Sequence, residues 1–280
     1  MSTTTKKSGP LSAVQQRALD SVRGVGRAAI DTAEDARGLR WLFTRTLYGT
    51  FTGRCERQML VRQLYHIGNK SLVFVAVTLG FLGMVLVFQT CLQVNKITGD
   101  LSQIGSDWVR ILVHEFGPTL TAMMMATRVG AGIAAELGSM QVTEQVDALR
   151  MCGVDPVDYL VVPRFLAHIL MSMVITIFAV VVAMAVGTLT AWLSFHVNPR
   201  TFFDIEKVQW GDVVLGLMKC VAYGSAIPVV SSYCGLGARG GSQGVGAATT
   251  RAVIGSSFAV LVLDFLLSGF GYRFLQHNGS

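Results

Sequence analysis

The stretch FLAHILMSMVITIFAVVVAMAVGTLTAWLS, from Phe165 to Ser194, contains no aspartate, glutamate, lysine or arginine. An α-helix rises about 1.5 Å per residue, so about 20 such residues cross the ~30 Å hydrocarbon core of a bilayer. This stretch is longer than that minimum. It therefore predicts a membrane-spanning helix, and it sets the class of the whole protein.

Four further apolar runs accompany this stretch. Of the 280 residues, 51% are hydrophobic and 14% are charged, and the mean hydropathy is +0.51. Soluble domains carry about 25% charged residues. We predict an all-α integral membrane protein with five transmembrane helices, at about residues 71–94, 111–140, 165–194, 213–236 and 252–270.

The chain before the first span has two parts. Residues 1–38 are polar, small and basic, without the pattern of a signal peptide, and we expect a tail that is disordered in part. From about 41 to 67, Trp, Phe and Leu alternate with Arg and His, which is typical of an amphipathic helix lying in the membrane interface. The membrane domain is therefore expected to cover residues 39–280.

The distribution of basic residues predicts the orientation. If the amino terminus is cytoplasmic, the cytoplasmic segments hold 16 Lys and Arg and the opposite segments hold 5. The positive-inside rule favours this arrangement, which places the carboxyl terminus outside. The net charge of +6 then indicates topology and anionic lipid rather than nucleic acid.

Ionisable side chains inside the predicted spans are costly, at about 2.5–3.5 kcal/mol each near a helix centre. Glu115, Lys219 and Asp264 fall at similar depths in spans two, four and five, towards the outer side. We predict an ion network in which Lys219 bridges the two carboxylates. Two interpretations stay open: the network locks the helices together, or it lines a cavity that opens to a lipid headgroup or to water.

Arg128 and Glu136 lie lower in the second predicted span. They are eight residues apart and so on nearly the same helix face. We predict a structural pair that fixes this helix against its neighbours. The small residues between Gly130 and Gly138 favour close helix packing.

The loop after the second span predicts a short cytoplasmic helix from Thr143 to Cys152. Thr143 suits the N-cap, and Gly153 and Pro156 end the helix. A helix this short is not stable alone, so we expect it to dock on a cytoplasmic partner. The residues expected to form this coupling helix are Thr143, Glu144, Gln145, Asp147, Ala148, Leu149 and Arg150.

Signatures of catalysis are missing from the sequence. It contains no Walker A, G-x-S-x-G or H-E-x-x-H motif, and its five histidines and five cysteines are too scattered to predict a metal site. GLGARG at 235–240 matches the dinucleotide fingerprint, but no strand is predicted before it, so we discount it. We predict no catalytic residue, no metal ligand and no nucleic-acid partner.

Six joined motifs resemble the MlaE (YrbE) permease family, over about residues 41–270. They are HEFGP at 114–118, ATRVGAGIAAELG at 126–138, TEQVDAL at 143–149, GVDP at 153–156, YLVVPR at 159–164 and GVGAATTRAV at 244–253. Phe116 stands where the family pattern has leucine, and the tail before Gly38 lies outside the resemblance.

The resemblance implies a non-catalytic permease subunit of an ABC-type phospholipid transporter in the bacterial inner membrane. It implies a homodimer, a cytoplasmic ABC ATPase docked on the 143–152 helix, an MCE-domain protein on the periplasmic side and a small cytoplasmic STAS-type subunit. ATP and magnesium would bind to the ATPase, and this chain would bind no cofactor. By the same resemblance, Glu115, Lys219 and Asp264 fall near the lipid cavity.

Two alternatives come from other functional classes. A non-transporting membrane scaffold that anchors an envelope assembly would need neither an intramembrane charge cluster nor a lipid cavity. An intramembrane enzyme acting on lipid would need a nucleophile beside a base, and the sequence shows no such constellation.

Overall fold

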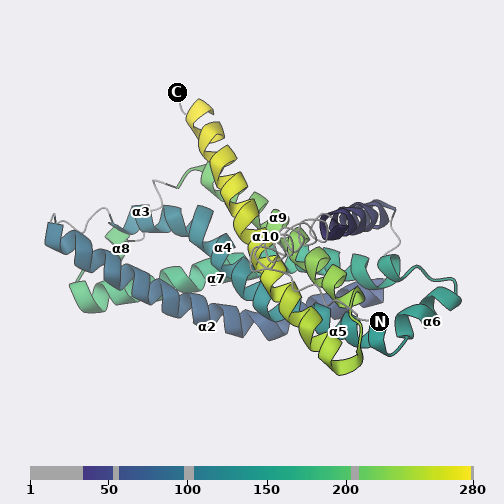
Figure 1. Ribbon diagram of the computed structural model, residues 1–280. Coiled ribbons are helices and arrows are strands. Elements are labelled where there is room, and N and C mark those ends of the chain that lie inside the picture. The colour runs from purple at the N-terminus through teal and green to yellow at the C-terminus, as the bar shows by residue number, and fades with distance from the viewer. Residues whose placement is uncertain (1–33, 53–56, 98–103, 203–207, 279–280) are drawn as a thin grey trace, which may run out of the picture. The chain divides into compact units, whose positions relative to one another are not determined.

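The computed structural model describes residues 34–52, 57–97, 104–202 and 208–278 (Figure 1). Contacts divide the chain into two units, Met1–Thr44 and Arg45–Ser280. The described part of the first unit, residues 34–44, is helical, and this helix continues to residue 51. Of the predicted tail, residues 1–38, the part from residue 1 to residue 33 lies outside the described residues.

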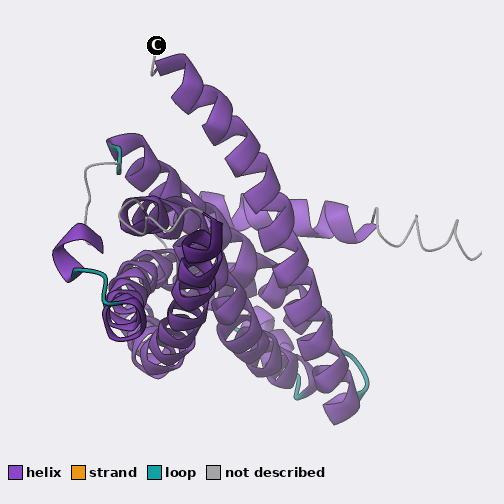
Figure 2. Cartoon of the chain, turned by 90° about the vertical axis from the view of Figure 1, so that its left-hand side faces the viewer, coloured by secondary structure: helices purple, strands orange, loops and turns teal. Residues whose placement is uncertain are grey.

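The described part of the second unit is helical apart from short loops, and it contains no strand (Figure 2). Its α-helices are α2 (Arg57–Ile97), α3 (Ile104–Ile111), α4 (Gly117–Met125), α5 (Ala131–Val142), α6 (Gln145–Met151), α7 (Val162–Phe195), α8 (Pro199–Phe202), α9 (Trp210–Leu236) and α10 (Gly241–Asn278). Three π-helical turns join some of them: η1 (Leu112–Phe116), η2 (Ala126–Gly130) and η3 (Val157–Val161).

Four helical stretches among the described residues are long and apolar enough to cross a membrane. They are Arg57–Ile97, Val157–Phe195, Trp210–Leu236 and Gly241–Gly269. Each contains or largely overlaps one predicted span, and together they make the protein a multi-pass membrane protein. The remaining predicted span, 111–140, lies within one continuous helical run from residue 104 to residue 142, in which η1 and η2 are π-helical turns. This run is not among the four apolar stretches.

The predicted boundary between the interfacial helix and the first span is wrong. We expected the helix to end near residue 67 and the span to begin near 71, but α2 runs from Arg57 to Ile97 without interruption. Residues 67–71 contain no proline, and Gly68, the glycine among them, packs against Met171 of α7. One helix therefore includes both the polar segment and the apolar span.

Small residues allow the long helices to pack closely. α2 packs along α7, where Gly83 meets the backbone of Ala183 and Gly187 meets Val87, so that a larger side chain at either glycine would collide with the neighbouring helix. α9 packs against α7 and α10, and α5 contacts both α9 and α10 (Figure 1). These contacts position α9 and α10 side by side.

A proline inside α9 is compensated by a histidine of α7. Pro228 has no N–H group, so the carbonyl of Gly224, four residues earlier, loses its helical hydrogen bond. Nδ1 of the fully buried His168 lies 3.0 Å from that carbonyl oxygen and replaces the missing donor. Ser172, one turn further along α7, donates to the carbonyl of Cys220 at 3.1 Å. The hydrogen bonds from His168 and Ser172 to backbone carbonyls of α9 thus link α9 to α7.

This pairing predicts a coupling between positions 168 and 228. His168→Leu should destabilise the protein, by about 1–3 kcal/mol for an unsatisfied buried carbonyl. The loss should be smaller in a Pro228→Ala background, because the substituted alanine would supply its own N–H to the carbonyl of Gly224. Thermal unfolding in detergent of the wild type, both single variants and the double variant measures the difference, and strictly additive effects would contradict the pairing.

Candidate functional site

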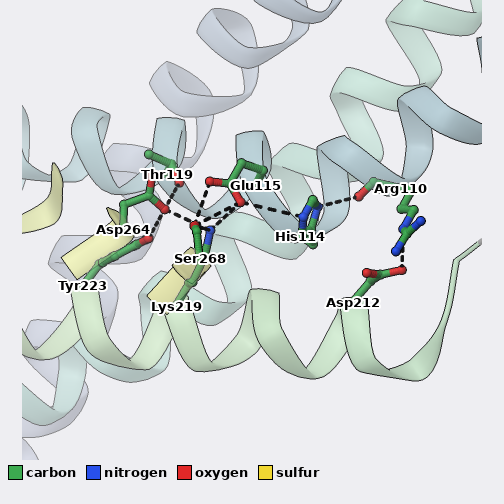
Figure 3. Close-up of polar contacts among 9 residues, drawn as sticks. All are labelled: Arg110, His114, Glu115, Thr119, Asp212, Lys219, Tyr223, Asp264 and Ser268. Atoms are coloured by element: carbon green, nitrogen blue, oxygen red, sulfur yellow. Dashed lines mark hydrogen bonds and ion pairs between the residues drawn. The ribbon is translucent and has the colours of Figure 1, made fainter. Parts of the chain in front are cut away.

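Lys219 of α9 lies at the centre of a polar cluster, and its side chain is completely buried. Its Nζ atom donates to Oε2 of Glu115 at 2.6 Å, to Oδ1 of Asp264 at 2.9 Å and to Oγ of Ser268 at 2.8 Å (Figure 3). These three acceptors use the full set of three donors that an ammonium group carries. The structure thus brings together the three charged residues that the sequence singled out, with Lys219 between the two carboxylates.

Further hydroxyl groups complete the network around the carboxylates. Oδ1 of Asp264 also accepts from the hydroxyl of Tyr223 at 2.6 Å and from that of Thr119 at 3.1 Å. Ser268 donates to Oε1 of Glu115 at 3.0 Å. The cluster, defined here as Glu115, Thr119, Lys219, Tyr223, Asp264 and Ser268, joins η1, α4, α9 and α10 (Figure 3).

The three hydroxyl residues were missed in the sequence, although a signal for them was present. A hydroxyl residue of the cluster follows each of its charged residues at a distance of four positions: Thr119 after Glu115, Tyr223 after Lys219 and Ser268 after Asp264. Residues four apart lie on the same face of a helix. The helical period therefore places a charge and a hydroxyl together on each of the three contributing segments.

The cluster is buried on its lysine side and partly exposed on its carboxylate side. The side chains of Glu115 and Asp264 retain 29% and 20% of their accessible surface, whereas Lys219 retains none. Two carboxylates face one ammonium, so the described groups of the cluster carry one excess negative charge. His114 Nε2 lies 3.8 Å from Glu115 Oε2 and offsets that excess when it is protonated. The arrangement can present carboxylate oxygens to a polar or cationic group.

A second ion pair lies further along α9, towards its start (Figure 3). Arg110 of α3 donates from Nε to Oδ2 of the fully buried Asp212 at 3.1 Å. The same carboxylate accepts from the backbone N–H of Gln209 and, with the Gln209 side chain, forms a capping box at the start of α9. Sequence reasoning placed both residues outside the spans and missed this pair.

An apolar hollow lies between α9 and α10, next to the cluster in sequence. Its volume is about 420 Å³, and it is lined by Val214, Leu217, Met218, Val221, Ala222 and Leu267. Met218 precedes Lys219 and Leu267 precedes Ser268, so the same two helices carry the polar cluster and the apolar hollow on adjoining faces. This combination suits a ligand with a polar and an apolar part.

Arg128 and Glu136 do not form the expected pair with each other. Eight residues of helix separate them by about 12 Å along the axis, and Glu136 Oε2 instead accepts from Nη2 of Arg164 at 3.0 Å. Arg164, at the start of α7, is almost completely buried and also donates to the carbonyl of Leu160. The ion pair at Glu136 therefore joins α5 to α7, while Arg128 lines a pocket between α2 and the run formed by η2 and α5.

The predicted short helix is present as α6, but its first residue is not the expected cap. The Thr143 hydroxyl donates backwards to the carbonyl of Ser139 at 2.8 Å and so ends α5, and Glu144 occupies the N-cap position with a left-handed φ of 62°. The predicted glycine stop is confirmed. Gly153 has φ +76°, its N–H donates to Arg150, and the N–H of Val154 donates to Leu149, which is a Schellman motif.

α6 presents a polar face, and a large exposed apolar side chain lies at its carboxyl-terminal end. Val146 is fully buried and holds the helix against the protein, while Asp147 and Arg150 pair at 2.8 Å on the exposed side. Met151 retains 90% of its accessible surface. A methionine exposed to this extent beside charged residues suits contact with a protein partner.

The loop after α6 is fixed by a charge pair. Arg45 donates to Asp155 Oδ2 at 2.7 Å, and the backbone N–H of Val157 donates to Asp155 Oδ1 at 2.9 Å. Burial alone would raise the pKa of Asp155, but these two hydrogen bonds outweigh it and hold the pKa below its ordinary value. The link therefore contributes stability at neutral pH and loses that contribution as the pH falls through the lowered pKa.

Comparisons with known proteins agree with this architecture. The family described as Permease MlaE matches residues 60–270. A probable ABC transporter permease of Synechocystis sp. is 38% identical over 218 residues, which cover 77% of this chain and 82% of the relative. A probable ABC transporter permease of Rickettsia felis is 37% identical over 215 residues, covering 75% of this chain and 82% of the relative.

A plant relative extends the comparison. The Arabidopsis thaliana protein named trigalactosyldiacylglycerol 1, chloroplastic, is 33% identical over 223 residues, which cover 79% of this chain and 63% of the relative. The region that the family model matches includes η1, α6, α9 and most of α10, the segments that carry the cluster and the short loop helix. The chain therefore belongs to the MlaE family of membrane permeases.

Proposed function

We propose that this chain is the permease subunit of an ATP-driven transporter that moves phospholipid between the bacterial inner membrane and an MCE protein. The observation that carries the proposal is the Lys219-centred cluster beside the apolar hollow of α9 and α10. A phospholipid has a charged headgroup and acyl chains, and the two surfaces match those two parts. The name of the plant relative contains a glycerolipid, which favours a lipid as the substrate class.

The proposed assembly supplies what this chain lacks. ATP and magnesium bind to a separate cytoplasmic ABC ATPase that docks on α6, and two copies of this chain form the membrane core. The MCE protein occupies the outer side, and a small STAS-type subunit binds in the cytoplasm. ATP binding shifts the permease between states that hold and release lipid, which requires the ATPase to bind those states unequally. The amino terminus is cytoplasmic in this proposal.

The role of the cluster charges can be separated from their structural role. Lys219→Met alone should destabilise the protein by about 3–5 kcal/mol, because it leaves two adjacent carboxylates without their cation. The triple variant Glu115→Gln, Lys219→Met and Asp264→Asn should fold, since it removes all three charges together. If the charges contact the headgroup, the triple variant should lose lipid transfer from loaded vesicles to the MCE protein in a reconstituted assembly.

A matched control is available on the same helix. Arg110→Gln with Asp212→Asn neutralises an ion pair outside the cluster and keeps the polar cap of α9, so it should leave lipid transfer close to that of the wild type. Normal transfer by the folded triple variant would mean that the cluster only holds helices together.

The docking role of α6 predicts a separate effect. Asp147→Arg and Met151→Asp change exposed side chains, so folding should be preserved. The first variant reverses a charge at the proposed interface and the second adds one, so recovery of the ATPase with the tagged chain should fall by about tenfold or more. Ile97→Asp, at a similarly exposed apolar residue at the end of α2, is the control and should not change recovery. Undiminished recovery with both α6 variants would rule out this docking site.

A further inference from the structure

A pocket of about 160 Å³ lies between α2 and the helical run formed by η2 and α5. Its lining residues are Gln63, His66, Ile67, Lys70, Ser71, Arg128, Val129, Gly132, Ile133 and Glu136. A Cβ atom added to Gly132 would meet no other atom within 4 Å, so this helix position borders open space. The pocket is separate from the Lys219 cluster, because Arg128 follows Glu115 by 13 residues, or roughly 20 Å of helix.

The polar groups of this pocket carry an excess of positive charge. Lys70 and His66 lie on the exposed side, with Nζ of Lys70 3.1 Å from Nε2 of His66. Arg128 is partly buried, and its Nη1 atom is fully buried with no hydrogen-bond partner among the described residues. Glu136 is the carboxylate in the lining, and its charge is already paired with Arg164.

An unpartnered guanidinium nitrogen is unusual, because a buried donor without an acceptor costs about 1–3 kcal/mol, and more when the group is charged. An anion bound in the pocket would supply that acceptor. A phosphoryl group suits the site, because it carries several strong acceptor oxygens that arginine and lysine both recognise. The pocket volume of about 160 Å³ leaves room for a phosphoryl group.

We propose that this pocket binds a phosphoryl group, held by Arg128 from inside and by Lys70 at the entrance. The source of the group is either the headgroup of an anionic phospholipid or free phosphate. Because Lys70 belongs to α2, one of the helices long and apolar enough to cross a membrane, a phospholipid can reach the pocket with its acyl chains remaining in the bilayer. The site does not depend on the proposed transport function, since a lipid bound here is a second ligand, distant from the cluster.

Native mass spectrometry of the full chain in detergent tests the proposal. The probes are dioleoyl phosphatidylglycerol, dioleoylglycerol, which has the same acyl chains without phosphate, and inorganic phosphate. Lys70→Ala removes one charge-assisted hydrogen bond and should weaken phosphatidylglycerol binding by about tenfold. Gly132→Leu should weaken it similarly by filling the pocket while every charge stays in place. Lys96→Ala removes an exposed lysine from the other end of α2 and should have no effect.

The two possible sources give different results. Displacement of phosphatidylglycerol by millimolar inorganic phosphate, in a Lys70-dependent way, identifies a site for free phosphate, and resistance to displacement identifies the lipid headgroup. Both results support the phosphoryl site. Arg128→Gln should abolish the Lys70-dependent binding, and the two other pocket variants test the proposal even if this one does not fold. Wild-type binding by both Lys70→Ala and Gly132→Leu, or equal binding of dioleoylglycerol, would overturn it.

Discussion

A lysine ammonium buried among membrane helices needs an acceptor for each of its donors, and Lys219 finds these on Glu115, Asp264 and Ser268. The requirement fixes more than one side chain. Because the acceptors lie on η1 and α10, a rotation of α9 by even part of a turn would leave a charge unpaired at a cost of several kcal/mol. The ion cluster therefore sets the relative rotation of the helices that also form the apolar hollow.

The helices depart from regular geometry where they carry polar groups. η1 holds Glu115 and η2 holds Arg128, and π-helical turns are frequently associated with functional sites. In α9, Pro228 releases a carbonyl that His168 of α7 satisfies. Inside a membrane such irregular backbone persists only where protein groups complete its hydrogen bonds. The carbonyl freed by Pro228 bonds to α7, and Glu115 of η1 bonds to Lys219 of α9, which also bonds to Asp264 of α10. These hydrogen bonds together connect η1, α7, α9 and α10.

The sequence was sufficient to predict the features that depend on local pattern. Long apolar runs predicted four stretches that the structure shows as helices long enough to span a membrane, and equal depth predicted that Lys219 lies between Glu115 and Asp264. Features that depend on distant partners were not predictable in the same way. Arg164 binds Glu136 across 28 positions, and Thr143 ends one helix instead of beginning the next. The hydroxyl residues of the cluster lie between these two classes. Their spacing of four residues from the charged residues is visible in the sequence, but their hydrogen bonds could be predicted only once the three charges were known to lie together.

The central claim is that this permease works as the membrane core of an ATP-driven lipid transporter. Affinity purification of the tagged chain from native membranes, followed by mass spectrometry of the proteins that accompany it, tests that claim most directly. Our account predicts recovery of a Walker-motif ATPase together with an MCE-domain protein. Recovery of the intact chain without any ATPase would contradict it and would favour a scaffold that anchors an envelope assembly.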